Sequence, residues 1–297
     1  MKDYIKLLRP KDWAKNLFLF VPYFFKGDPP TSKDIRLLII GFLTFCCFAS
    51  SIYIINDYRD IEDDRRHPEK SKRPLASGKV DKSAAVAICI LLMTAGIFLA
   101  YFPDHTFKFL FIAGVYFLIN LAYSFGLKNI AILDIILLAS GFVLRVKGGA
   151  AITNTDTSSW LIIMTFLLAL FMSIAKRRDD ILLKMSTGND MRKSVKGYNL
   201  DFLNTMLGLL GGIIIVAYIM YTVDPETYVR LQAYRLYYTS LFVIAGVMRY
   251  LQITFVHQNS GSPTKILYKD WFIQLTLVLW AASFYVILYL RHVTIFK

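Results

Sequence analysis

The chain has 297 residues, of which 56% are hydrophobic and 15% aromatic, and its formal net charge is +13. This apolar content lies above the range of ordinary soluble domains and recurs in long runs, which excludes a soluble globular protein and favours an integral membrane protein. The positive charge does not require a nucleic acid, because basic cytoplasmic loops and phosphorylated ligands account for it. We therefore expect no nucleic-acid partner.

Nine apolar segments follow one another along the chain, most of them close to the roughly 20 residues that cross a hydrocarbon core. The first is short and contains Pro22, which predicts a broken or oblique span. The segments are 16–26, 35–57, 82–102, 106–125, 130–152, 158–176, 203–223, 233–256 and 270–291. The predicted fold is all-α: a polytopic membrane protein with one domain over residues 1–297 and a polar cavity that faces the cytoplasm.

Two connections between these segments, 58–82 and 176–202, are long and charged. If the N-terminus lies inside the cell, both connections are cytoplasmic, and the cytoplasmic segments together carry most of the 34 lysines and arginines. This asymmetry is typical of cytoplasmic loops. The connections on the opposite side, such as 152–158, are short and nearly uncharged. We therefore expect the chemistry of the protein at the cytoplasmic face.

An acidic stretch ends the second apolar segment. If the helix continues through it, Asn56, Asp60 and Asp64 recur at every fourth position and Asp57 joins them on one side. Like charges at this spacing repel each other, and the C-terminal end of a helix adds partial negative charge, so a cation is needed. Mg²⁺ is expected because it binds carboxylates together with the oxygens of a substrate phosphate. The alternative is a solvated helix end that neighbouring arginines neutralise.

A basic loop that includes Lys70 and Arg73 follows the acidic stretch. Cations beside a metal suit a diphosphate, whose free oxygens they can bind, although an ordinary cytoplasmic loop is also basic. Burying a charge in lipid is costly, so ionisable groups near the apolar segments should face a polar cavity or a partner. Each of these groups alone also fits snorkelling or a structural ion pair. They are Lys15, Lys128, Asp134, Arg145, Lys147, Lys176, Arg177, Asp179, Asp180, Arg249 and Asp270.

The pattern Asn56-Asp57-x-x-Asp60-x-x-x-Asp64 resembles the motif NDxxDxxxD of the UbiA-type intramembrane prenyltransferase superfamily. In that superfamily the motif lies at the cytoplasmic end of the second of nine helices. Further residues resemble the decaprenyl-phosphate phosphoribosyltransferase branch over nearly the whole chain. They are Arg9-Pro10, Trp13, Lys15-Asn16, His67-Pro68, Lys70, Arg73-Pro74, Tyr123-Ser124, Lys128, Leu133-Asp134, Ser140-Gly141, Leu144-Arg145, Lys176-Arg177, Arg192-Lys193-Ser194 and Arg249-Tyr250.

The resemblance implies a UbiA-like bundle that transfers 5-phosphoribose from phosphoribosyl diphosphate to a polyprenyl phosphate, with Mg²⁺ required. It implies that Asn56 and the catalytic Asp57, Asp60 and Asp64 hold the metal and the diphosphate. Substrate binding is expected of Lys15, Asn16, Asn56, Lys70, Arg73, Tyr123, Lys128, Arg145, Lys176, Arg177, Asp180 and Arg249.

The chain departs from the superfamily after the sixth segment. Many members carry a second DxxxD motif there, whereas this chain has Lys176-Arg177-Arg178-Asp179-Asp180. The carboxylates for a second metal are therefore incomplete, and basic residues at this place are candidates for the 5-phosphate of the donor.

Two other functions fit the same features. The first is prenyl transfer from a prenyl diphosphate to an aromatic or other acceptor, with the same motif binding the metal. The second is transport of a lipid phosphate, for which charges within the membrane are also expected. Transport explains the acidic stretch less well, because carboxylates repel an anionic cargo unless a metal intervenes.

Overall fold

The computed structural model describes residues 2–26, 31–65, 70–103, 107–187, 197–233, 235–256, 266 and 269–289. These residues form helices and connections without a strand, which confirms the predicted all-α fold for the described part of the chain. They divide into two compact units. Unit 1 comprises Met1–Lys128 and Ser140–Thr157, and unit 2 comprises Asn129–Ala139 and Ser158–Lys297. The motif residues at 67–68 and 192–194 lie outside the described residues.

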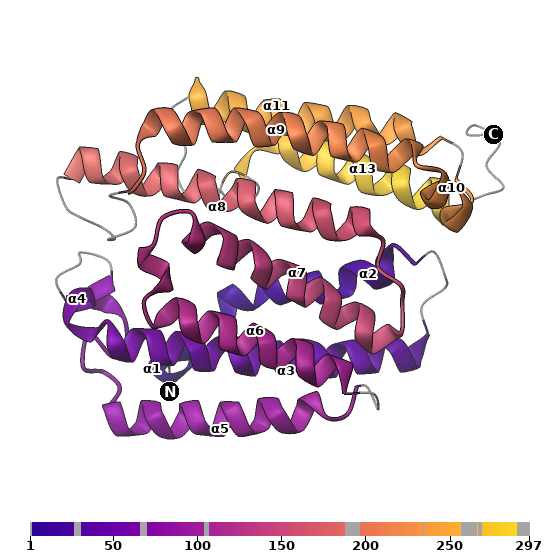
Figure 1. Cartoon of the computed structure of the whole chain (residues 1–297). Helices are drawn as coiled ribbons and strands as arrows, with labels where there is room; N and C mark the ends of the chain where they lie inside the picture. The colour runs from indigo at the N-terminus through magenta and orange to yellow at the C-terminus, as the bar shows by residue number, and fades with distance from the viewer. Residues whose placement is uncertain are drawn as a thin grey trace. The chain divides into compact units, whose positions relative to one another are not determined.

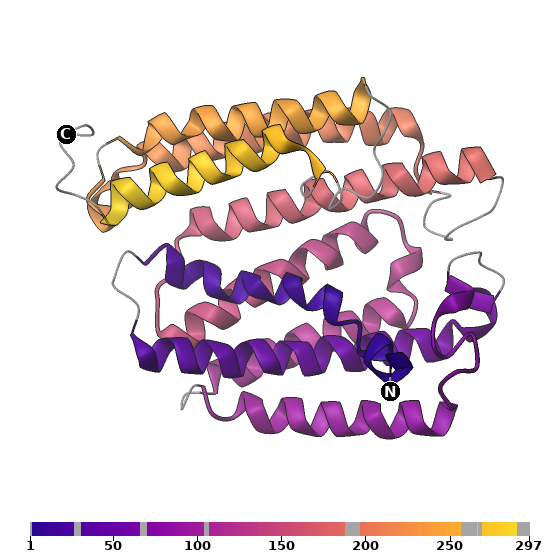
Figure 2. The same cartoon turned by 180° about the vertical axis from the view of Figure 1, so that it is seen from behind.

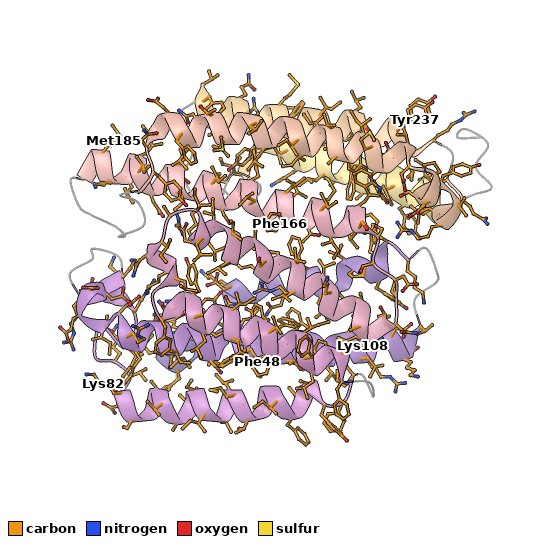
Figure 3. The ribbon with its side chains drawn as sticks, viewed as in Figure 1. Phe48, Lys82, Lys108, Phe166, Met185 and Tyr237 are labelled. Atoms are coloured by element: carbon orange, nitrogen blue, oxygen red, sulfur yellow. The ribbon has the colours of Figure 1, made fainter. Side chains whose placement is uncertain are left out.

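Unit 1 is built around the long helix α3, Ser32–Arg59, against which α1, η1, α5 and α6 pack (Figure 1). The N-terminal segment runs along α3 (Figure 2). Figure 3 labels Lys82 and Lys108, the first residues of α5 and α6, at opposite ends of the unit, since these two helices run in opposite directions. The other elements are α1 Lys2–Leu8, η1 Pro10–Phe20, α2 Val21–Phe24, α4 Ile61–Arg65, η2 Lys70–Lys72, α5 Lys82–Ala100, α6 Lys108–Ser124 and η3 Leu127–Asn129.

Helix α7, Leu133–Thr153, contributes its first residues to unit 2 and the remainder to unit 1. In unit 2, α9 packs against α8 and α11, and α11 packs against α13. Leu203, Leu207 and Ile214 of α9 are almost fully buried in the core of this unit. The elements are α8 Ser159–Thr187, α9 Leu200–Val223, α10 Pro225–Leu231, η5 Leu236–Thr239, α11 Ser240–Phe255 and α13 Trp271–Tyr289.

Six of the described helices are long and apolar enough to cross a membrane, namely α3, α5, α7, α8, α9 and α13. Helix α6 is apolar but shorter, with 17 residues. All seven lie where apolar segments were predicted, because burial in lipid requires long runs without charge. The prediction of a multi-pass integral membrane protein is confirmed.

The first predicted segment is not a regular α-helix. Residues Pro10–Phe20 form the 3₁₀ helix η1, and the short helix α2 follows. Helix α7 approaches η1 so closely that a Cβ atom on Gly149 would lie 1.8 Å from the carbonyl oxygen of Leu19. Glycine is therefore required at this position, and the close approach brings the side chains of η1 against α7.

Substituting Gly149 with alanine is expected to lower the melting temperature of the detergent-purified protein. The added methyl group meets backbone, which cannot rotate away, so the cost is that of overpacking, about 1–3 kcal/mol. Gly114 of α6 is the control, because a Cβ there would meet nothing within 4 Å. Gly114→Ala should leave stability unchanged or raise it slightly, since alanine favours the helix. Equal melting temperatures of the two variants would contradict the close contact.

Candidate functional site

Three aspartates at the end of α3, here named the acidic cluster, are Asp57, Asp60 and Asp64. Helix α3 ends at Arg59, and α4 begins at Ile61 after Asp60 alone. The regular helix is therefore interrupted at Asp60. The backbone N–H groups of Asp60 and Asp64 nevertheless donate to the carbonyl oxygens of Asn56 and Asp60 at 3.0 and 2.7 Å. Asp57 and Asp64 are only 1% and 3% exposed, whereas Asp60 is half-buried.

Arg73 joins the two buried members of the acidic cluster. Its Nη1 donates hydrogen bonds to Asp57 Oδ1 at 3.0 Å and to Asp64 Oδ2 at 2.7 Å. The backbone N–H of Arg73 donates to the carbonyl oxygen of Lys70 at 2.9 Å, which holds the arginine in the turn after η2. The guanidinium thus offsets the repulsion between the two carboxylates. Lys70 itself is half-buried in η2.

Lys128 binds the third carboxylate. Its Nζ donates to Asp60 Oδ2 at 2.7 Å and to Asn56 Oδ1 at 2.9 Å. Asn56 Nδ2 also donates to Asp60 Oδ2, at 3.1 Å. The structure therefore brings together Asn56, Asp60 and Lys128, which were all predicted site residues, by placing η3 beside the end of α3. Tyr123 is half-buried in the last turn of α6.

Arg9 also belongs to this site, although the sequence did not place it among the expected binding residues. Its Nη2 donates to Asp57 Oδ1, and its guanidinium lies 4.9 Å from the ring centroid of Tyr53. Arg9 joins α1 to η1 with a φ of 51°, a left-handed conformation that is costly for a residue with a Cβ. The available indication was Arg9-Pro10, a few positions before the first apolar segment and among the residues that carry the family resemblance.

Three predicted residues of unit 1, Lys15, Asn16 and Arg145, make their hydrogen bonds in the described structure with residues outside the acidic cluster. Lys15 pairs with Asp12 at 2.6 Å and remains partly exposed. Asn16 is fully buried, donates to Cys46 Sγ at 3.2 Å and accepts from Arg145 Nε at 2.8 Å. The structure therefore places Asn16 and Arg145 in direct contact, 129 positions apart in the sequence.

A second charged group lies within unit 2. Arg177 Nε donates to Asp134 Oδ2 at 2.6 Å, and Arg177 Nη1 donates to Asp180 Oδ2 at 2.9 Å. The hydroxyl of Tyr198 donates to Asp134 Oδ1 at 2.7 Å. Arg177 and Asp134 are both 0% exposed, whereas Lys176 is exposed. Two carboxylates therefore already compensate the charge of Arg177.

Arg249 forms an ion pair at the start of α13. Its Nη2 donates to Asp270 Oδ2 at 2.8 Å, and Asp270 Oδ1 accepts the backbone N–H of Ile273 at 3.0 Å. The hydrogen bonds from Arg249 hold the pKa of Asp270 below its ordinary value. In the described structure Arg249 therefore stabilises the cap of a helix, and its predicted contact with substrate stays a prediction.

Removing the Tyr198 hydroxyl is expected to make stability less sensitive to alkaline pH. Burial and the hydrogen bond to Asp134 raise the pKa of Tyr198 above its ordinary value of 10.0. Because the folded pKa is raised, the stabilisation is complete below the ordinary pKa and is lost as pH rises through the folded pKa. Tyr198→Phe should therefore melt below the wild type at neutral pH, and the difference should shrink above pH 10.0. A difference that stays constant across this range would contradict the assignment.

The donor set of the acidic cluster fits a divalent ion by its chemistry, since carboxylate and amide oxygens are the ligands that Mg²⁺ prefers. The Nη1 nitrogen of Arg73 donates to both Asp57 and Asp64, so these carboxylates can share one cationic group. Within the described ranges, no three acidic, histidine or cysteine side chains group closely enough to form a metal centre. The metal therefore stays a prediction.

Comparisons with known proteins agree with this fold and motif. The sequence profile of the UbiA prenyltransferase family matches residues 18–185. The decaprenyl-phosphate phosphoribosyltransferase of Corynebacterium glutamicum is 31% identical over 280 residues, which cover 93% of this chain and 83% of that protein. The protein of the same name from Mycolicibacterium smegmatis is 30% identical to this chain over 289 residues, which cover 94% of this chain and 90% of that protein.

The structure of a UbiA homolog from Archaeoglobus fulgidus bound to GPP and Mg²⁺ matches this chain with a TM-score of 0.71 at 20% sequence identity. The match covers 96% of this chain and 99% of that chain, so the two proteins share one fold. Together with the family match, this fold identifies a membrane-embedded transferase. The chain belongs to the UbiA prenyltransferase family.

Proposed function

We propose that the chain transfers 5-phosphoribose from phosphoribosyl diphosphate to a polyprenyl phosphate of the decaprenyl type and releases diphosphate. The observation that carries this proposal is the similarity to decaprenyl-phosphate phosphoribosyltransferases over 93% of the chain. The site adds support, because Arg9, Arg73 and Lys128 gather around the acidic cluster. A reaction between two anionic substrates requires such cations to screen repulsion.

Mg²⁺ is the metal we expect, held by Asn56 and by the acidic cluster. When bound, it would screen the charge on the diphosphate leaving group. The side chains of Arg73 and Lys128 already lie within hydrogen-bonding distance of these carboxylates, and they are placed to bind the remaining phosphate oxygens. The fold match to a UbiA homolog bound to GPP and Mg²⁺ supports a metal of this type.

The reaction needs no strong general base. A polyprenyl phosphate is already anionic near neutral pH, so the protein has to orient it and screen its charge. The C1–O bond of the donor breaks through an oxocarbenium-like transition state, and the lipid phosphate attacks C1 from the face opposite the diphosphate. The isoprenoid tail remains along apolar helices that face the bilayer.

The orientation of the protein forms part of this proposal. We place the acidic cluster and the N-terminus on the cytoplasmic side of the cytoplasmic membrane, with nine spans in one functional domain over residues 1–297. The basic connections 58–82 and 176–202 support this orientation, because cytoplasmic loops carry the excess of Lys and Arg. Phosphoribosyl diphosphate, which carries several negative charges and cannot cross lipid, then reaches the site from the cytosol.

Purified protein in detergent tests the proposal. It is incubated with Mg²⁺, a polyprenyl phosphate and labelled phosphoribosyl diphosphate, and in parallel with labelled prenyl diphosphates and an aromatic acceptor. We expect diphosphate release and a labelled lipid only with the phosphoribosyl donor. Product from the prenyl donors alone would assign the rival transferase activity. Diphosphate release would also rule against transport of a lipid phosphate as the function, since detergent leaves no compartments to transport between.

A further inference from the structure

The guanidinium of Arg145 carries a positive charge that no carboxylate compensates among the described residues. Its side chain is only 6% exposed. Its three hydrogen bonds go to neutral oxygens: Asn16 Oδ1 at 2.8 Å, the carbonyl oxygen of Gly141 at 2.9 Å and the hydroxyl of Tyr116 at 2.8 Å. Arginine has five N–H donors, so two remain for a further acceptor. Arg9, Arg73 and Lys128 differ, since each contacts an aspartate.

The position of Arg145 is fixed, so the charge cannot move toward water. Its guanidinium lies 4.7 Å from the ring centroid of Tyr116 and 5.4 Å from that of Phe142. With three hydrogen bonds and two aromatic contacts, the side chain is held in one conformation inside unit 1. A buried charge without a counter-ion is strongly unfavourable in a membrane protein. Such an arrangement is typical of a site whose counter-ion is a ligand.

Polar side chains connect Arg145 to the acidic cluster. Along α3, Cys46, Ser50, Tyr53 and Asp57 recur at helical spacing on one face. Each of them contacts a residue of the N-terminal segment: Cys46 contacts Asn16, Ser50 contacts Trp13, and Tyr53 and Asp57 contact Arg9. At 1.5 Å per residue, this stripe extends about 16 Å along the helix. The stripe thus runs from Asn16, which Arg145 contacts, to the acidic cluster, where Arg9 binds Asp57.

This polar stripe suits one of the two candidate donors. A prenyl diphosphate has one anionic end, and beyond its diphosphate lies an apolar chain. Phosphoribosyl diphosphate carries a second phosphate on the other side of a ribose whose hydroxyls form hydrogen bonds. If the diphosphate binds at the acidic cluster, an unpaired guanidinium at the far end of a polar stripe favours the donor with two anionic ends and disfavours an apolar chain.

We propose that Arg145 binds the 5-phosphate of phosphoribosyl diphosphate and thereby selects this donor over prenyl diphosphates. This inference rests on the function proposed above. Arg177, which the sequence also offered for this phosphate, is already paired with Asp134 and Asp180. Among the described residues, Arg145 has no carboxylate partner and keeps two N–H donors for a ligand. The phosphate of the lipid acceptor has the same chemistry. A monoester at the end of a ribose fits the enclosed position of Arg145 better than a phosphate attached directly to a long apolar chain.

The substitution Asn16→Asp tests the proposal without removing volume. It places a carboxylate where Asn16 Oδ1 now accepts from Arg145 Nε, so it neutralises the guanidinium in place. We expect the KM for phosphoribosyl diphosphate to rise about tenfold to a hundredfold, the range for losing a charged hydrogen bond, while the melting temperature is kept or rises. If Arg145 had only a structural role, Asn16→Asp would leave the KM for phosphoribosyl diphosphate unchanged, because the new ion pair would only hold the arginine more firmly in its present position.

Arg145→Gln is the second variant, and Lys147→Gln is the matched control two residues along α7, because Lys147 is exposed. We expect Arg145→Gln to raise the KM for the donor, with the KM for the polyprenyl phosphate and kcat little changed, and Lys147→Gln to match the wild type. A rise confined to the KM for the lipid would assign Arg145 to the acceptor and overturn the proposal. Unchanged KM values for both substrates in Asn16→Asp would also overturn it. If wild-type protein does not turn over phosphoribosyl diphosphate at all, the proposed function is wrong, and this outcome is distinct from a failure of the Arg145 proposal alone.

Discussion

Replacing Asp60 by asparagine is expected to lower kcat/KM at least about a hundredfold, since loss of a metal-binding charge costs several kcal/mol of transition-state stabilisation. Asp60 is the member of the acidic cluster that best tolerates substitution, because its side chain is 29% exposed and lies in the break between α3 and α4. The asparagine keeps the hydrogen bond from Lys128. The variant should therefore stay folded and require a higher Mg²⁺ concentration for half-maximal turnover.

Asp63→Asn is the matched control. Asp63 is an exposed carboxylate of α4 in the same acidic stretch, and it lies outside the predicted metal ligands. It should retain wild-type turnover and an unchanged Mg²⁺ titration. Both variants should melt close to the wild type. If Asp60→Asn turns over at the wild-type rate with the same Mg²⁺ dependence, the metal site proposed at the acidic cluster is wrong.

The substitution Asp134→Asn is expected to lower the free energy of unfolding by about 3–5 kcal/mol, because it leaves a buried arginine without its principal counter-ion. Asp134 and Arg177 are both 0% exposed, and their contact is 2.6 Å long. The asparagine also loses part of the acceptor strength that holds the Tyr198 hydroxyl. Asp180 compensates Arg177 only partly, since its side chain is 22% exposed. Thermal or denaturant unfolding in detergent measures the loss.

An exposed ion pair in the same chain provides the comparison. Glu62 accepts from Arg65 at 3.0 Å, with side-chain exposures of 73% and 50%. Water screens this pair, so Glu62→Gln should change stability by less than about 1 kcal/mol. If the two variants lose similar amounts of stability, the buried pair in unit 2 does not carry the stabilisation that we assign to it.

The positions of the long helices follow from the sequence, because apolar runs long enough to cross lipid leave few alternatives. The first segment does not follow the same rule. Its 3₁₀ conformation accompanies a close contact between Leu19 and Gly149, which lie far apart in the sequence. The propensities of the segment itself carry no information about this contact. A local pattern therefore placed the element but did not determine its geometry.

In the candidate site, too, the sequence predicted some features and left others undetermined. The spacing of Asn56 and Asp60 placed them on one side of the helix, and in the structure their side chains are in contact at 3.1 Å. Helix α3 ends before Asp60 and α4 begins after it, and spacing alone did not indicate this one-residue break. The partners of the acidic cluster come from three other segments, carried by Arg9, Arg73 and Lys128. Such pairings depend on tertiary packing, so the sequence identified two of these cations as candidates without assigning their carboxylates.

The shared guanidinium of Arg73 has a consequence for biogenesis. Each aspartate of the acidic cluster already has a cationic partner from within the chain. A newly inserted polypeptide can therefore neutralise this end of α3 by itself, before any divalent ion arrives. Chelators should accordingly stop turnover without unfolding the enzyme. The metal-free protein should remain folded in the membrane and regain activity when the ion is added back.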